Sequence, residues 1–310
     1  MSIILFLASV LTVVGIYAII TMALNLSYGQ TGINDFGVMA WVAIGAYAYS
    51  IITVDPPGTM IGTSYLIGLH MPIWVGVLGA MFFSALFAFL VGLPTLRLRG
   101  EYLAVAAYAF SMVVASVFTN EAWLTNGVRG FFGLKQPLID YFNVDGYTYF
   151  FLALVWVIAL VVFLVLQRIA HSPFGRTLRA IRENEEVAIS IGKNLWKFRM
   201  TAYVLSAAIA GMAGAMYIWY TTLIVPDMFS EAMTFTVWIA LILGGTGNYK
   251  GALLGAAVLI GAQEATRFFQ ASADMAPVLA SIRFVAIGVL MVVIIRFKRR
   301  GLIPEKKIEM

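Results

Sequence analysis

The stretch Asn25–Gly37 (NLSYGQTGINDFG) interrupts a long apolar run with polar residues and glycines. A second stretch, Leu243–Gly251 (LGGTGNYKG), interrupts another apolar run late in the chain, and both contain Thr-Gly followed within two residues by Asn. Irregular backbone at membrane depth persists only where protein or a water-filled cavity satisfies its N–H and C=O groups. Interrupted segments in corresponding positions of two halves indicate a transport site. The alternative interpretation is that both stretches are ordinary loops, and their spacing agrees equally with either.

The composition identifies the class of protein. Of the 310 residues, 62% are hydrophobic and 11% are charged, whereas a soluble domain is roughly half apolar and about a quarter charged. The chain has no cysteine and two histidines far apart in sequence, which excludes disulfides and thiolate metal ligands and argues against a metal centre. The net charge of +5 clusters beside apolar runs, as the positive-inside bias predicts, and does not indicate a nucleic-acid partner.

The apolar runs predict an all-α integral membrane protein, a single transmembrane domain over residues 1–310 with about 8–10 transmembrane segments, some of them discontinuous. An apolar run of about 20 residues crosses a bilayer. The opening residues lack a charged region and a cleavage site, so we expect the first run to be retained as a span. The predicted spans are residues 3–24, 38–54, 73–93, 101–119, 147–166, 200–220, 233–243, 252–269 and 282–295.

Basic residues give these spans an orientation. Arg97 and Arg99, the loop 169–199 and the tail 297–310 carry the basic clusters and are predicted to be cytoplasmic, because cytoplasmic loops are enriched in Lys and Arg. The loop 120–146 then lies outside the membrane, and the short N-terminus lies on that same outer side.

The cytoplasmic loop contains an amphipathic pattern. Ser172-Pro173 is typical of a helix N-cap followed by proline at the first helical position, and Gly192 with Asn194 predicts the stop. The apolar side chains fall on one helical face, and charged side chains flank it. The apolar residues are Phe174, Leu178, Ile181, Ala188 and Ile191, and the flanking ones are Arg176, Arg179, Arg182, Glu183 and Glu186. Such a helix either lies on lipid or fits a groove on a cytoplasmic protein, and the mixed charges favour the groove.

Small residues recur at helix-packing intervals. Gly247, Gly251 and Gly255 form two overlapping G-x-x-x-G steps, and the range 207–215 repeats the spacing with Ala207, Gly211 and Ala215. We assign Gly211 and Gly255 to close helix packing, because small residues let helix backbones approach where lipid gives no hydrophobic driving force.

Charged residues inside the predicted spans are few. Glu264 and Arg267 are three residues apart and either pair within the membrane or extend their charged groups to its surface. Asp35 is the one acid inside the first interruption. It either caps the helix that starts near Phe36 or contacts a substrate ammonium, and we favour the cap because a helix N-terminus stabilises an acid.

Three segments resemble a known family. Arg97–Tyr102 (RLRGEY), Ser172–Glu183 (SPFGRTLRAIRE) and Leu243–Asn248 (LGGTGN), the last followed by Gly251 and Gly255–Ala256, resemble the permease subunits of branched-chain amino acid ABC importers. The resemblance extends from about Asn25 to the C-terminal basic cluster and is closer to the LivM-type subunit than to its LivH-type partner.

Two positions depart from the LivM pattern. Asn126 stands where a glycine is common, and Asn34–Gly37 resembles the LivH pattern where LivM-type subunits usually have Ser-Gly-His. Relatives of this architecture import leucine, isoleucine and valine, other amino acids, urea or short amides, and aromatic acids.

The resemblance implies a multi-pass permease in a bacterial or archaeal inner or plasma membrane. Its implied partners are a second homologous permease subunit, two cytoplasmic ATPase subunits and a periplasmic or extracellular substrate-binding protein. ATP and Mg would reside on the ATPases, and we expect no cofactor in this chain, which has no Gly-x-x-x-x-Gly-Lys-Ser/Thr loop. The implied ATPase-coupling helix runs from Phe174 to Gly192. The coupling residues are Phe174, Gly175, Arg176, Leu178, Arg179, Ile181, Arg182, Glu183 and Glu186.

The importer hypothesis assigns a substrate path to the two interruptions, without catalytic residues. Helix N-termini after Asn34 and Asn248 would favour a substrate carboxylate. The path residues are Asn25, Ser27, Gly29, Gln30, Gly32, Asn34, Gly244, Gly245, Gly247 and Asn248.

Two other function classes compete with this hypothesis. A secondary transporter would work without ATPases, and a pull-down of ATPase partners separates the two. An intramembrane enzyme would need a Ser/His, Asp/Asp or metal-ligand group within the spans, and the sequence shows none.

Overall fold

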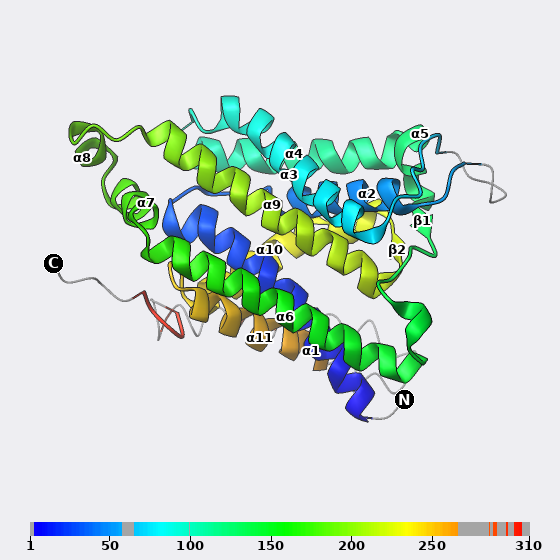
Figure 1. Cartoon of the computed structure of the whole chain (residues 1–310). Helices are drawn as coiled ribbons and strands as arrows, with labels where there is room; N and C mark the ends of the chain where they lie inside the picture. The colour runs from blue at the N-terminus through cyan, green and yellow to red at the C-terminus, as the bar shows by residue number, and fades with distance from the viewer. Residues whose placement is uncertain are drawn as a thin grey trace.

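The computed structural model describes residues 3–57, 65–98, 100–265 and 301–305, together with residues 285, 288, 289 and 296. These residues form a bundle of long helices that run roughly along one axis (Figure 1). The α-helices are α1 (Ile3–Leu24), α2 (Val38–Thr53), α3 (Ile73–Thr95), α4 (Glu101–Asn120), α5 (Ala122–Thr125), α6 (Val144–His171), α7 (Pro173–Glu183), α8 (Glu185–Ser190), α9 (Leu195–Thr221), α10 (Glu231–Gly244) and α11 (Tyr249–Ala265). The strands are β1 (Phe131–Phe132) and β2 (Leu223–Ile224).

The helices have the length and composition of membrane spans, which confirms the predicted all-α polytopic fold. Six helical segments of the described residues are long and apolar enough to cross a bilayer, and α2 is a shorter apolar helix. The six are Ile3–Gln30, Ile73–Thr95, Glu101–Asn120, Asp145–His171, Leu195–Thr221 and Pro226–Gly244. The predicted ninth span, 282–295, and Arg267 lie outside the described residues, apart from three positions of that span.

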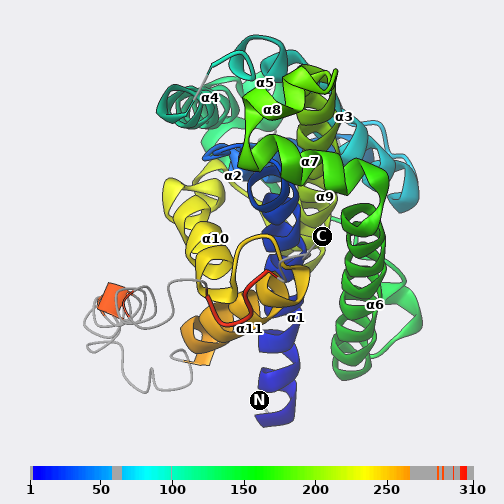
Figure 2. The ribbon, with the colours of Figure 1, turned by 90° about the vertical axis from the view of Figure 1, so that its left-hand side faces the viewer.

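Burial separates inner helices from outer ones. The most apolar part of α1 is 61% buried and that of α9 is 67% buried, whereas the corresponding parts of α3, α4 and α6 are only 22–28% buried. Seen from the end that carries α7 and α8, α1 and α9 lie in the middle, with α4, α6, α10 and α11 around them (Figure 2). The core of the bundle is therefore built on α1 and α9, and α2 and α3 pack against α9 and against each other.

Small residues bring neighbouring helices together, as predicted for Gly211 and Gly255. A methyl group on Gly45 of α2 would lie 2.3 Å from the Gly211 Cα of α9, and one on Gly255 of α11 would lie 2.0 Å from the carbonyl oxygen of Ala240 in α10. Gly247 is different from the rest of its predicted stripe, because α11 starts only at Tyr249 and Gly247 has a positive φ of 81°. It belongs to the interruption between the two helices.

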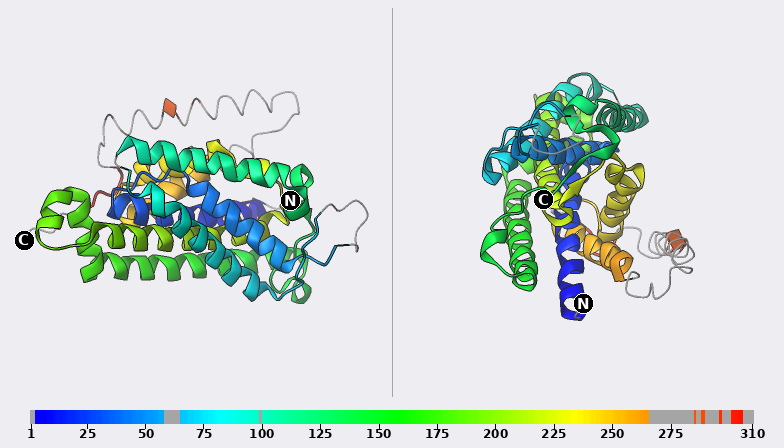
Figure 3. Two further views of the ribbon diagram at one scale, coloured as in Figure 1. Left: turned by 90° about the horizontal axis from the view of Figure 1, so that it is seen from above. Right: turned by 90° about the vertical axis from the view of Figure 1, so that its right-hand side faces the viewer.

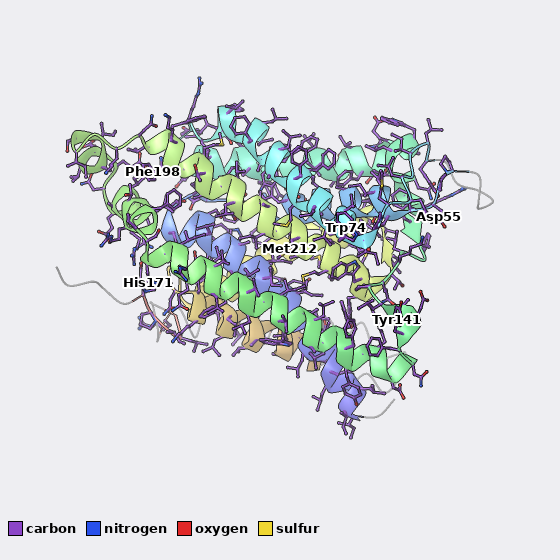
Figure 4. The ribbon with its side chains drawn as sticks, in the orientation of Figure 1. Asp55, Trp74, Tyr141, His171, Phe198 and Met212 are labelled. Atoms are coloured by element: carbon purple, nitrogen blue, oxygen red, sulfur yellow. The ribbon has the colours of Figure 1, made fainter. Side chains whose placement is uncertain are left out.

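The two ends of the bundle have different structures. The helices α7 and α8 project from one end, where His171 and Phe198 also lie, and Asp55 and Tyr141 lie at the other end (Figures 3 and 4). This second end also carries the N-terminus (Figure 1). The loop 120–146 there contains α5, two 3₁₀ turns and β1, which pairs antiparallel with β2 through Phe131 opposite Ile224. The sequence analysis predicted no strand in this loop.

The predicted helix 174–192 is wrong in one respect, because it is two helices. Ser172 caps α7 as expected, and its Oγ accepts a hydrogen bond from the Gly175 N–H at 3.3 Å. The chain then turns at Asn184, whose Oδ1 accepts the Glu186 and Val187 N–H groups at 3.0 and 3.2 Å and starts α8. Asparagine side chains compete with helical hydrogen bonding through such contacts. The predicted helix rested on the spacing of apolar residues, which carries no information about this competition.

The close contact of Gly211 in α9 with α3 gives a stability prediction. A methyl group on Gly211 would lie 2.2 Å from the Ser84 Oγ and 2.7 Å from the Ala80 carbonyl oxygen. We expect Gly211→Ala to destabilise the protein by roughly 1–3 kcal/mol, as overpacking does. The matched control is Gly261→Ala in α11, where no atom of the described residues lies within 4 Å of the added methyl. Thermal unfolding in detergent should show a lower Tm for the first variant only, and equal Tm values would contradict the packing.

Candidate functional site at the helix interruptions

The two interruptions lie against each other. The Gly247 N–H donates to Asn25 Oδ1 at 2.8 Å, and the Gln30 Nε2 donates to the Gly247 carbonyl at 2.9 Å. Asn25 and Gly247 are 222 residues apart in the sequence. Side-chain amides of the first interruption thus satisfy both backbone groups of Gly247 in the second.

The first interruption begins later than predicted. The chain continues from α1 as a π-helix over Asn25–Gln30, and the irregular part is limited to Thr31–Gly37. π-Helical turns widen a helix locally and occur often at functional sites. The wider turn places Asn25 beside Gly247 while leaving the helix backbone hydrogen-bonded.

Gly29 allows the two segments to approach. A methyl group at this position would lie 1.9 Å from Asn25 Oδ1 and 2.7 Å from the Gly247 amide nitrogen. Gly245 and Gly247 have φ angles of 116° and 81°, and Gly32 has a φ of 75°, conformations that side chains disfavour. These glycines therefore allow backbone conformations that other residues disfavour, and Gly29 also allows the two segments to pack closely.

The polar side chains of the first interruption are buried. Asn25 and Ser27 are fully buried, Gln30 is 1% exposed, and Asn34 is partly exposed. Two of their polar atoms, Asn25 Nδ2 and Gln30 Oε1, have no hydrogen-bond partner in the part of the chain that the structure describes. Each such buried group costs about 1–3 kcal/mol, so this arrangement contains unused hydrogen-bonding capacity.

Asp35 interacts with its own chain. Its carboxylate accepts the Gly37 N–H and the Trp41 Nε1–H, both at 3.0 Å, and its carbonyl accepts the Trp238 Nε1–H at 3.1 Å. The residue is fully buried. The helix starts at Val38, with Gly37 as its N-cap, rather than near Phe36. The carboxylate thus supports the turn into α2, and its oxygens are occupied by groups of the chain itself.

Two helix N-termini were expected to attract a substrate carboxylate, but N–H groups at both already bond to acceptors within the chain. Asp35 accepts the Gly37 N–H before α2, and Asn248 Oδ1 accepts the Lys250 N–H at 3.0 Å in the first turn of α11. The Asn248 Nδ2 also donates to the Pro304 carbonyl at 3.2 Å. The expectation that both helix N-termini are open to a substrate carboxylate therefore does not fit these contacts.

Arg182 of α7 connects the first interruption to the C-terminal segment. Its guanidinium donates to the Gly29 carbonyl and, at 2.7 Å, to the Glu305 carboxylate. Arg179 of the same helix lies 3.8 Å from the other Glu305 oxygen. We call Arg179, Arg182 and Glu305 the arginine node. All three side chains are between 17 and 24% exposed, so the charges are only partly screened by solvent.

The C-terminal segment is tied to the second interruption by its backbone. The Leu302 and Ile303 N–H groups donate to the carbonyls of Leu243 and Gly244, both at 2.9 Å. These bonds satisfy the last carbonyls of α10, which a helix end leaves without intrahelical partners. Sequence reasoning did not find the role of Glu305, because nothing in its local sequence indicates a partner 123 residues away.

The apolar face of α7 is covered by the bundle itself. Leu178 and Ile181 are fully buried and Ala188 of α8 is 1% exposed, and Phe174 stacks on Phe198 of α9 with ring centroids 5.5 Å apart. These side chains were predicted to enter a groove on a partner, which is wrong, since they anchor α7 to its own chain. Ile191 is 63% exposed because the turn at Asn184 takes it off the buried face.

The residues available to a partner lie on the opposite side. Arg176, Glu183 and Glu186 are exposed, as predicted for the flanks. The sequence analysis missed Val187 and Ile189, which are each 55% exposed on α8. Together with Ile191 they form an exposed apolar group, which we call the α8 patch, at the tip of the projecting end (Figure 1).

The contact between the interruptions gives a second stability prediction. Asn25→Ala removes the acceptor of the Gly247 N–H and leaves that group buried without a partner. We expect a loss of about 1–3 kcal/mol in unfolding free energy, measured by thermal unfolding of the purified protein. Asn143→Ala is the control, because Asn143 is exposed and its side chain makes no capping bond. A Tm unchanged in both variants would contradict the role of Asn25.

Comparison with known proteins shows which family this chain resembles. The family model of the branched-chain amino acid transport system permease component matches residues 6–295. The probable branched-chain amino acid transport permease protein LivM of Methanocaldococcus jannaschii is 32% identical over 95% of this chain and 92% of its own length. The high-affinity LivM permease protein of Salmonella typhimurium is 28% identical over 94% of this chain and 69% of its own. The probable LivH permease protein of M. jannaschii is 23% identical over 82% and 78%.

No solved structure matches the chain significantly. The match to the family model covers nearly the whole chain, and the LivM relatives align over more of it than the LivH relative does. The chain belongs to the family of permease components of branched-chain amino acid transport systems, and it is of the LivM type.

Proposed function

We propose that this chain is the transmembrane permease subunit of an ATP-binding-cassette importer for branched-chain or related amino acids. Partner ATPases would drive it between outward-facing and inward-facing states, without covalent chemistry in this chain. The observation that carries the proposal is the position of Arg182, which joins the cytoplasmic helix α7 to the backbone of the first interruption and to the segment bonded to the second.

The interruptions are the proposed cytoplasmic gate and the inner wall of the substrate path. Their buried, tightly packed polar groups exclude water in the present arrangement. The unpartnered Asn25 Nδ2 and Gln30 Oε1 favour a second arrangement in which they bond to a passing solute or to water. A gate needs two arrangements of similar free energy, and incomplete hydrogen bonding keeps the closed one from being too stable. The path residues remain those predicted from the sequence.

The arginine node would transmit force. Movement of α7 by an ATPase pulls on the Gly29 carbonyl through Arg182, and on the second interruption through Glu305 and the backbone bonds of Leu302 and Ile303. One helix thus acts on both interruptions together. Force applied to only one interruption would break the hydrogen bonds that join the two segments, whereas the shared arginine moves them as a pair.

The proposed partners follow from this mechanism. A second homologous permease subunit would complete the path, two ATPases with ATP and Mg would contact α7 and α8, and a soluble binding protein would deliver substrate at the other end. The location would be a bacterial or archaeal inner or plasma membrane. Urea, short amides or aromatic acids are alternative substrates for the same machinery, and a carrier without ATPases is the alternative mechanism.

Uptake in proteoliposomes tests the proposal. The permease would be co-expressed with the genes for its ATPase and second permease subunits, purified, and reconstituted with the binding protein and radiolabelled leucine. We expect uptake that requires internal ATP. Uptake driven by an ion gradient without ATPases would support the carrier instead, and uptake of urea but not leucine would reassign the substrate.

The arginine node gives a coupling prediction. Arg182→Gln should lower the amount of solute transported per ATP hydrolysed roughly tenfold, a coupling loss of ordinary size for linked sites, because α7 loses the bonds of this guanidinium to Gly29 and Glu305 and keeps only the longer Arg179 contact with Glu305. Lys193→Gln, an exposed change on the same loop, is the control. Uptake and ATP hydrolysis are measured on the same vesicles. An unchanged ratio in Arg182→Gln, with the complex intact, would refute the role of the node.

The α8 patch gives an assembly prediction. Val187→Glu combined with Ile191→Glu should release the ATPases during co-purification, because charges would replace apolar surface at the proposed contact. The control is Val128→Glu, which is 68% exposed on the loop at the opposite end. ATPases retained at wild-type stoichiometry in the double variant would place their contact elsewhere. All substituted residues are exposed, so the Tm should stay the same.

A further inference from the structure

A cavity lies on one side of the bundle, between α4 and the start of α10. Its volume is about 630 Å³, within the usual range of small-molecule sites. It is bounded by α4, by the 3₁₀ turn Pro226–Phe229 and by the first turn of α10, with Met39 of α2 also in its wall. Figure 2 shows α4 and α10 on the same side of the bundle. We call this space the α4–α10 cavity.

Two carboxylates line this cavity. Glu231 is the first residue of α10. Thr119 and Asn120, the last two residues of α4, line the cavity as well, so it reaches the end of that helix. Asp227, in the 3₁₀ turn before α10, lines the same cavity.

Both acids require a polar neighbour. Asp227 and Glu231 are exposed, and a carboxylate is costly against lipid unless it faces water, a cation or a partner. No lysine, arginine or histidine is among the described side chains that line the cavity. The N-terminus of α10 stabilises Glu231 through its helix dipole, but this leaves the charge of Asp227 without compensation.

A buried hydroxyl also points to a ligand. Thr234 lines the cavity with only 2% of its surface exposed, and no hydrogen bond of its side chain is present among the described residues. The hydroxyl of Tyr47, whose ring centroid lies 6.3 Å from that of the cavity residue Phe229, has no partner among them either. Buried polar groups of this kind are normally bonded, so the cavity offers hydrogen bonds that its own residues leave unused.

We propose that the α4–α10 cavity binds the ammonium group of the transported solute, with Glu231 and Asp227 as its counter-ions and Thr234 as a hydrogen-bonding group. The apolar wall of Met39, Met112 and Phe229 suits an aliphatic side chain. The inference rests on the proposed function. It places substrate selection for a cationic amine in this cavity and leaves the interruptions as the gate beyond it.

Thiol labelling tests the site directly, because the chain contains no cysteine. Ser230→Cys in the assembled transporter would be treated with a positively and a negatively charged methanethiosulfonate reagent, with the parental complex as background. We expect the positive reagent to react roughly tenfold faster, relative to a free thiol, because the two carboxylates concentrate cations. Adding Glu231→Gln and Asp227→Asn should remove this preference. Equal rates before neutralisation, or a thiol unreactive with both reagents, would overturn the proposal.

Substrate protection identifies the group that binds. Leucine should slow the labelling, and N-acetyl-leucine, which lacks the ammonium, should not. Equal protection by both compounds would show that the charge is not recognised. In uptake assays, Glu231→Gln should raise KM roughly tenfold, the loss of about one charge-assisted contact, with ATP hydrolysis retained. Asp140→Asn at the exposed outer loop is the control.

The two proposals fail in different ways. If the thiol shows the charge preference and leucine protection but no ATP-driven uptake is seen, the amine site is supported and the importer function is refuted. If leucine uptake is driven by ATP but its KM is unaffected by both neutralising substitutions, the importer function is supported and the cavity is refuted as its amine site.

Discussion

The structure depends on how the backbone is satisfied where two membrane helices are interrupted. A peptide N–H or C=O in a bilayer has no water to bond to, so an interruption persists only if another part of the protein supplies partners. Here the amides of Asn25 and Gln30 bond both backbone groups of Gly247, and the segment 301–305 bonds the carbonyls at the end of α10. Each interruption is therefore stable only in the presence of the other elements.

This mutual dependence explains why the charged residues at the projecting end matter. Arg182 is held at the same point by the Gly29 carbonyl and by Glu305. Because the guanidinium is planar and has five donors, it can serve both acceptors at once, which a lysine cannot do in the same geometry. The packing of Leu178 and Ile181 against the bundle keeps α7 from moving independently of these contacts. A displacement of α7 is thus a displacement of the interruptions.

Two separate regions of the described chain combine polar groups in different ways. Those of the interruptions are buried, close-packed and mostly bonded within the chain, which suits closure. Those of the α4–α10 cavity surround open volume and include two exposed carboxylates, which suits a solute with a positive group. The aromatic contacts of Trp238 with Phe36 and Tyr28, at 4.5 and 4.6 Å between ring centroids, join α10 to the first interruption and add rigidity there.

The sequence by itself determined the local features: the membrane class, the limits of α1 at Ile3 and Leu24, the Ser172 cap of α7 and the small residues at helix contacts. These follow from hydropathy, capping and residue size, which act over a few positions. Only the tertiary structure decided that Asn25 meets Gly247, that Glu305 meets Arg182, that the apolar face of α7 turns inward, and that Glu231 lines a cavity. Such contacts join residues far apart in sequence, and they are set by how whole helices pack, which no local pattern specifies.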